Sequence, residues 1–124
     1  MPVTYRVADG VIEMTLEGES TPDAVIECFD RALQDAATPA KFALFLDVRR
    51  STSLATRPTT EIIRVAEHLG PNKDRVTRCA VLATENIHFG LSRLGAVYSE
   101  TAGVMTSVFR DREEALAWLR GETS

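Results

Sequence analysis

The side chains best suited to chemistry gather just beyond a short apolar run that ends near Asp47. The stretch from residue 49 to residue 60 is rich in hydroxyl and guanidinium groups, and with the acid before it the candidates for ligand or partner contact are Asp47, Arg49, Arg50, Ser51, Ser53, Thr56 and Arg57. Such groups donate hydrogen bonds to anions, and the positive N-terminus of a following helix adds to the attraction. The stretch therefore indicates a site that holds a single anionic group.

A purely structural interpretation competes with this one. Thr59 or Thr60 would then cap the next helix, and the rest of the stretch would be a solvated loop. Asp47 has two alternative roles, because a carboxylate in that place either orients a ligand or a loop hydroxyl or accepts hydrogen bonds from neighbouring backbone amides.

Histidine, cysteine and serine patterns give little support for catalysis. His88, in the first turn of an expected helix, is a further site candidate, and a hydrolase using it or Asp47 is a minor alternative. Cys28 and Cys79 lie in apolar patterns typical of buried reduced thiols. Ser92 lacks the Gly-x-Ser-x-Gly spacing of a nucleophile elbow. Without a phosphate loop, a dinucleotide fingerprint or a metal-ligand cluster, the sequence predicts no enzyme, cofactor or metal.

Length and composition are those of one small domain. The 124 residues are 44% hydrophobic and 26% charged, with a formal net charge of −4, so a single domain over residues 1–124 is expected. Scattered arginines in an acidic chain do not form the cationic cluster that nucleic acids require. No apolar run approaches the ~18 residues of a membrane span, and the first residues do not resemble a secretory signal. We therefore expect a cytoplasmic protein.

Periodicity and chain breakers predict the elements that place these residues. Strands are expected at 3–7, 11–16, 42–48, 79–83 and 105–109, with a tight turn at Asp9-Gly10. Helices are expected at 21–37, 61–69, 86–98 and 111–121. In the third helix the expected buried face is Ile87, Leu91, Leu94 and Tyr98. The order β-β-α-β-α-β-α-β-α indicates the α/β class, with a mixed, mostly parallel five-stranded sheet and four helices.

Two stretches in this order carry a family resemblance. One is the strand at 44–48, which ends in an acid before the hydroxyl-rich loop, and the other is 108–119, with Phe109, Asp111 and then Glu-Ala-x-x-Trp-Leu. They resemble the STAS-like domains of the SpoIIAA-like group, which is related to anti-sigma-factor antagonists and is also compared with SEC14-type lipid-binding domains.

The resemblance implies a non-catalytic regulatory or protein-interaction module with a protein partner, such as a kinase or a regulator. Anti-sigma-factor antagonists carry a phosphorylatable Ser or Thr in a pattern close to Asp-Ser-Ser-Gly, and the offset from Asp47 places Thr56 at that position. The preceding acid and the glycine are missing here. The alternative is a SEC14-like domain that binds a small apolar molecule or lipid in a cavity under the third helix, where Gly90 and Gly95 either permit close packing or mark a mobile element. A homodimer through helix faces or edge strands stays open.

Overall fold

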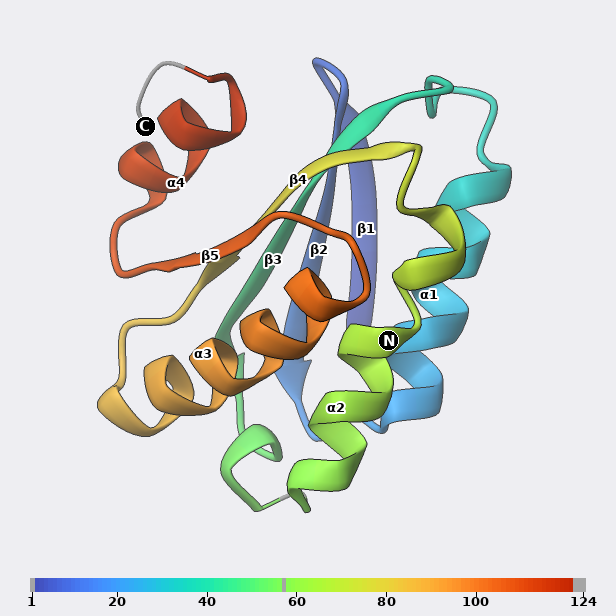
Figure 1. Ribbon diagram of the computed structural model, residues 1–124. Helices are drawn as coiled ribbons and strands as arrows, with labels where there is room; N and C mark the ends of the chain where they lie inside the picture. Colours follow the sequence, from blue (N-terminus) through green and yellow to red (C-terminus); the bar gives the residue numbers. More distant parts are fainter. Residues whose placement is uncertain (1, 57, 122–124) are drawn as a thin grey trace.

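The computed structural model describes residues 2–56 and 58–121, which form a five-stranded sheet flanked by helices (Figure 1). The strands are β1 (Val3–Ala8), β2 (Val11–Gly18), β3 (Phe42–Ser51), β4 (Val76–Leu82) and β5 (Thr106–Phe109). They lie in chain order across the sheet; the first pair is antiparallel and the later pairs are parallel. The predicted fold class and element order are confirmed.

The hairpin that opens the sheet follows from its turn residues. Ala8 pairs with Val11, so only Asp9 and Gly10 form the loop. Both have positive φ angles, 53° and 77°, which a two-residue turn needs to match the twist of the strands. Beyond the turn, alternate β2 residues point to one face of the sheet, where Ile12 and Met14 are buried.

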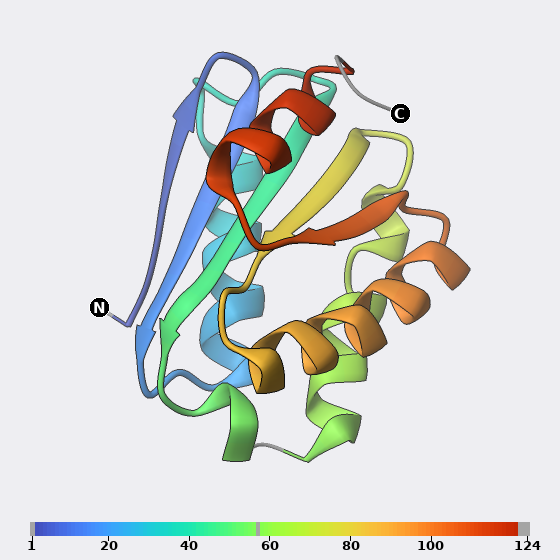
Figure 2. The ribbon, with the colours of Figure 1, turned by 90° about the vertical axis from the view of Figure 1, so that its left-hand side faces the viewer.

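The helices are α1 (Pro22–Gln34), α2 (Thr59–Glu67), α3 (Asn86–Thr101) and α4 (Arg112–Leu119), with short 3-10 turns η1 (Leu54–Thr56) and η2 (Gly70–Asn72). Right-handed crossovers between strands that advance in one direction place α1, α2 and α3 on the same face. Helix α4 follows the last strand and lies on the opposite face (Figures 1 and 2). We call these the inner face and the outer face of the sheet.

Two helices begin at the predicted caps. The Thr21 hydroxyl accepts a hydrogen bond from the Ala24 amide at 3.1 Å, and the Asp111 carboxylate accepts one from the Glu114 amide at 3.1 Å. Helix α1 ends at Gln34, earlier than the predicted end near Ala37. The carboxylate of Asp35 accepts the Ala37 amide at 2.9 Å and so turns the chain away from the helix.

The start of α2 and the cap of α3 differ from prediction. Helix α2 begins at Thr59 instead of Glu61, and neither it nor α3 has a side-chain cap. Thr59 lies inside the helix and does not cap it, and Asn86 is the first residue of α3, after Glu85 at the cap position. Both helices therefore begin with fewer satisfied amides than α1 and α4.

The buried face of α3 is not the predicted one. Ile87 was expected to be buried and is 53% exposed, and Leu91, Leu94 and Tyr98 are only half-buried. The residues that α3 buries are His88, Ser92 and Ser99. Close approach to α2 explains part of this choice, because a Cβ atom on Gly95 would lie 3.4 Å from the Ile62 side chain. Small side chains fit this line of contact and leucines do not.

Candidate functional site

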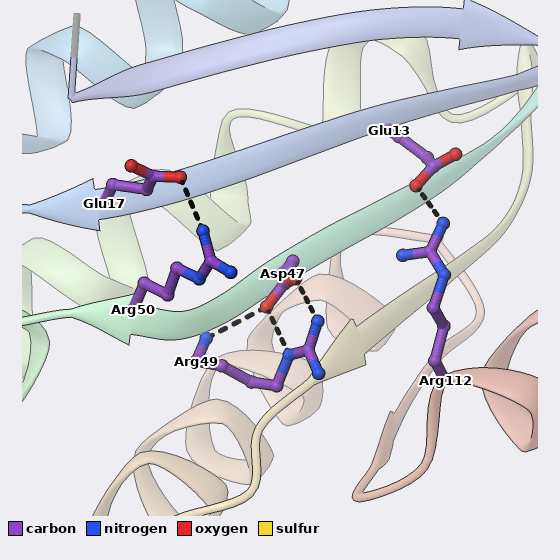
Figure 3. Close-up of polar contacts among 6 residues, drawn as sticks. All are labelled: Glu13, Glu17, Asp47, Arg49, Arg50 and Arg112. Carbon is purple, nitrogen blue, oxygen red and sulfur yellow. Dashed lines mark hydrogen bonds and ion pairs between the residues drawn. The ribbon is translucent and has the colours of Figure 1, made fainter.

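Asp47, the acid in the predicted site, accepts hydrogen bonds from Arg49, two residues further along the chain. One carboxylate oxygen accepts the Arg49 amide at 3.0 Å and Nε at 3.1 Å, and the other accepts Nη2 at 2.9 Å (Figure 3). Burial disfavours the charged form, but these bonds outweigh it and hold the pKa of Asp47 below its ordinary value. The carboxylate of Asp47 therefore accepts hydrogen bonds from the local backbone and from the Arg49 side chain. Of the two roles expected for Asp47, this arrangement matches the bonding to neighbouring backbone amides.

The predicted arginines do not converge on an anion site. Arg49 is paired with Asp47, while Arg50 lies 3.3 Å from the carboxylate of Glu17 on β2 (Figure 3). Arg57 lies outside the described residues. Each described guanidinium of this stretch already faces a carboxylate, so the arrangement offers little uncompensated positive charge.

A second charged cluster, which the sequence analysis missed, lies on the same outer face. Glu13 accepts Arg112 of α4 at 2.6 Å and Arg6 of β1 at 2.9 Å. Burial alone would raise the pKa of Glu13, but the two guanidinium groups bring it below its ordinary value. Their separation in sequence, 99 residues for Glu13 and Arg112, left no local signal. These contacts join α4 to the sheet.

The loop hydroxyls hold the loop together. The buried Ser53 hydroxyl accepts the Ser20 amide at 3.0 Å and donates to the Ser20 carbonyl at 3.1 Å. The buried Ser51 hydroxyl accepts the Leu54 amide at 3.2 Å. Thr56 donates to the Ser53 carbonyl at 2.9 Å and is the exposed residue of the three. Ser51 and Ser53 therefore join β3 and η1 to the segment before α1.

The inner face of the sheet holds a partly open cavity of about 140 Å³ beneath α1, α2 and α3. Its floor is formed by apolar side chains of β2, β3 and β4, and its walls by one flank of each helix; the main contributors are Met14, Leu16, Val25, Phe29, Leu44, Leu46, Ile62, Val65, Val81 and Leu91. The cavity lies under the third helix, where the sequence analysis placed its alternative ligand site.

An ion pair and a hydrogen bond connect the two helices at one side of this cavity. Arg64 of α2 pairs with Asp23 of α1, and Nε2 of His68 lies 2.9 Å from a carboxylate oxygen of Asp30. The His68 ring also lies edge-on to Phe29, with 6.1 Å between ring centroids. These contacts connect α1 to α2, and His68 and Phe29 also line the cavity.

The polar stripe of α3 faces this inner side. His88, Ser92, Gly95 and Ser99 follow one another at helical spacing, and Ser92 and Ser99 are 9% and 3% exposed. Ser92, Gly95 and Ser99 line the cavity. His88 is 5% exposed, and its Nδ1 atom has no hydrogen-bond partner among the described residues. Of these residues the sequence analysis proposed only His88 as a site candidate, and it considered Ser92 only as a nucleophile.

Reactive groups elsewhere are poorly placed for chemistry. Burial raises the pKa of Cys28, and raises that of Cys79 to about 12, so both thiols stay protonated at neutral pH. Over residues 2–56 and 58–121, no three His, Cys, Asp or Glu side chains gather as a metal site would require. Within the same ranges no helix has the length and apolarity to cross a bilayer.

Comparison with known proteins assigns the fold. A family model described as SpoIIAA-like matches residues 11–120. The chain belongs to the SpoIIAA-like family. This SpoIIAA-like chain is also similar in structure to an uncharacterized protein of the DUF3478 family from Shewanella loihica PV-4, which has a SpoIIAA-like fold. The TM-score is 0.60 at 16% identity, over 94% of this chain and 91% of that one. The predicted STAS-like resemblance is confirmed.

Two other comparisons add nothing to this assignment. A crystal structure of Mglu in its native form aligns with a TM-score of 0.35 at 14% identity, over 93% of this chain and 27% of that one, and such an overlap carries no argument. Comparison with curated protein sequences gives no significant match.

Proposed function

We propose that this SpoIIAA-like domain is a non-catalytic binding module that encloses a small apolar molecule in the cavity beneath α1, α2 and α3. The observation that carries the proposal is the cavity itself, about 140 Å³ lined mainly by aliphatic and aromatic side chains. An engineered apolar cavity of about 150 Å³ stays dry and binds benzene. A ligand of that size is therefore the expected occupant.

The energetic cost of such a cavity supports a functional origin. At roughly 24 cal/mol for each Å³, a fully closed cavity of this volume would cost about 3 kcal/mol, and this cavity, which is partly open to solvent, costs less than that. The closed-cavity value is a large fraction of the roughly 5–15 kcal/mol by which domains are stable. Ordinary cores are packed without such voids. A retained void fits a site whose ligand restores the missing contacts.

Benzene is a suitable probe for this function, with unfolding temperature as the readout. A ligand that binds only the folded state stabilises it, and at ten times Kd the gain is about 1.4 kcal/mol, or roughly 5 °C. The cavity-filling variant Ala96→Leu should fold and lose this shift, because Ala96 lines the cavity. Val97→Leu is the matched control, since its neighbour Val97 is 61% exposed. A wild-type protein that benzene does not stabilise would refute the proposal.

Regulation through a protein partner is a second candidate, and the exposure of Thr56 favours it. Its hydroxyl lies in η1, on the loop that Ser53 joins to the segment before α1. A phosphate there would replace the bond to the Ser53 carbonyl and alter this junction. Protein from the native host should then show one added phosphate by intact mass, and Thr56→Ala should abolish it. An unmodified mass under all growth conditions would rule out this switch.

A further inference from the structure

Two hydroxyls on the cavity wall lack the partners that buried hydroxyls normally have. Ser92 and Ser99 both line the cavity and are 9% and 3% exposed. Among the described residues neither side chain makes a hydrogen bond. In the same helix the Thr101 hydroxyl donates to the Val97 carbonyl at 2.9 Å, the bond that helical serines and threonines commonly make. The two serines do not make it.

Neither serine hydroxyl belongs to the fully buried side-chain atoms without a partner, so both stay open to the cavity. A molecule in the cavity can therefore supply the hydrogen bond that the described residues do not make. Alanine at either position would favour the helix. Two apolar residues of α3, Ile87 and Val97, are meanwhile more than half exposed. Ser92 and Ser99 thus lie on the wall of a mainly apolar cavity, beside Leu91.

Charge on the cavity wall limits the ligand to a neutral one. No lysine or arginine is found among the described residues that line the cavity, whereas the carboxylate-bearing Glu61 is among them. An anion moved into an apolar cavity needs a cationic partner to offset lost hydration. The imidazole of His68, which also lines the cavity, is hydrogen-bonded to Asp30.

We propose that the ligand is a neutral, mainly apolar molecule bearing a hydroxyl or carbonyl oxygen, which hydrogen-bonds to Ser92 or Ser99 inside the cavity. This inference rests on the proposed function and adds the ligand's chemical class. The serines are seven residues apart, roughly 10 Å along the helix axis. A molecule of benzene's size reaches one of them, and a longer one with oxygens at both ends reaches both.

The test compares benzene, phenol and benzoate, which share a ring and differ in the polar group. Dissociation constants are measured by titration calorimetry for wild type, Ser92→Ala, Ser99→Ala and the double variant. A net hydrogen bond is worth about 0.5–1.5 kcal/mol, so its loss should raise the Kd of phenol about two- to tenfold. The Kd of benzene should stay the same or fall. Thr101→Ala, which removes an exposed hydroxyl from the same helix, should change neither value.

The outcomes distinguish failure of the serine contact from failure of the cavity function. If benzene binds wild type but the serine variants leave the Kd of phenol unchanged, or raise both constants equally, the serine contact is wrong and the cavity function stands. If benzoate binds more tightly than phenol, the neutral class is overturned. If neither benzene nor phenol binds, both proposals fail. Thermal unfolding confirms that each variant is folded, which is expected because alanine favours the helix.

Discussion

Helices α3 and α4 cover opposite faces of the same sheet and are built in contrasting ways. Helix α4 has an aspartate cap, and Trp118 packs against Phe109 with 5.5 Å between ring centroids, beneath the guanidinium of Arg78. Helix α3 has no side-chain cap and buries a histidine and two serines. In α4 the cap and the aromatic ring have their partners within the protein. In α3 polar side chains are buried without partners among the described residues, beside a cavity.

The contrast separates structural residues from functional ones. On the outer face the charged groups are matched in pairs, as Glu13 with Arg112 and Asp47 with Arg49. On the inner face an apolar cavity meets hydroxyls that have no partner in the described residues. Departures from good packing and hydrogen bonding are expected where a protein binds something else. The inner face is therefore where we place the ligand.

The largest expected effect is on the outer face, at Trp118. Trp118→Ala should lower the free energy of unfolding by about 3–5 kcal/mol, because it removes a large buried ring and its aromatic and cationic contacts. Urea unfolding measures this loss. Benzene binding to the folded fraction should be unchanged, since the cavity lies on the other side of the sheet. A loss below about 1 kcal/mol would contradict the description of α4 as tightly packed.

Substitutions at the caps of α4 and α3 should change the free energy of unfolding by smaller amounts and in opposite directions. Asp111→Ala should cost about 1 kcal/mol, the usual value of an N-cap hydrogen bond. Glu85→Ser, at the uncapped start of α3, should instead stabilise the protein by up to about 1 kcal/mol, as a cap added to free amides does. The two midpoints in urea should therefore move in opposite directions. Shifts in the same direction would show that the two helix starts do not differ as described.

The glycines of α3 separate helix propensity from cavity shape. Gly90→Ala and Gly95→Ala should each stabilise the helix by up to about 1 kcal/mol. A Cβ at position 90 meets nothing within 4 Å, whereas one at position 95 lies 3.4 Å from Ile62 and narrows the cavity. Benzene should bind Gly90→Ala like wild type and Gly95→Ala more weakly. Equal binding to both variants would mean that the ligand does not lie beside Gly95.

The smallest expected effect is a change in how the free energy of unfolding depends on pH, which arises from Asp47 on the outer face. The pKa of Asp47 is lower in the folded protein than its ordinary 3.8, because Arg49 outweighs burial. Its stabilisation is present above the unfolded value and is lost as pH falls through the lower folded one. Asp47→Asn should therefore lose less stability than wild type between about pH 5 and about pH 2. Glu17→Gln, which removes an exposed pair of little energetic value, should follow wild type. An Asp47→Asn curve parallel to wild type would contradict the role of Arg49.

Local signals in the sequence were sufficient for most of the fold. Asp9-Gly10, Thr21-Pro22 and Asp111 act through residues within four positions of themselves, so their turn and caps were predictable. The parallel sheet followed from alternating strands and helices. Helix ends were less accurate, because side-chain bonds such as that of Asp35 to the Ala37 amide compete with the helix.

The candidate site was harder to predict because it depends on tertiary packing. Asp47 at the end of β3 and Ser53 in the loop after it were identified as polar site candidates, and their partners, Arg49 and Ser20, could not be read from the sequence. The predicted buried face of α3 is displaced by one residue: Ile87 and Leu91 follow the apolar periodicity, while the helix buries His88 and Ser92. A cavity has no sequence pattern of its own.

The most direct test of the binding proposal is methyl NMR of the protein with benzene. Methyl signals of Leu91 and Val65, which line the cavity, should shift and saturate together, with contacts from the benzene protons to both. Val97, exposed on the same helix as Leu91, should not shift. No change at saturating benzene, or shifts confined to exposed methyls such as Val97, would contradict a ligand site beneath α1, α2 and α3.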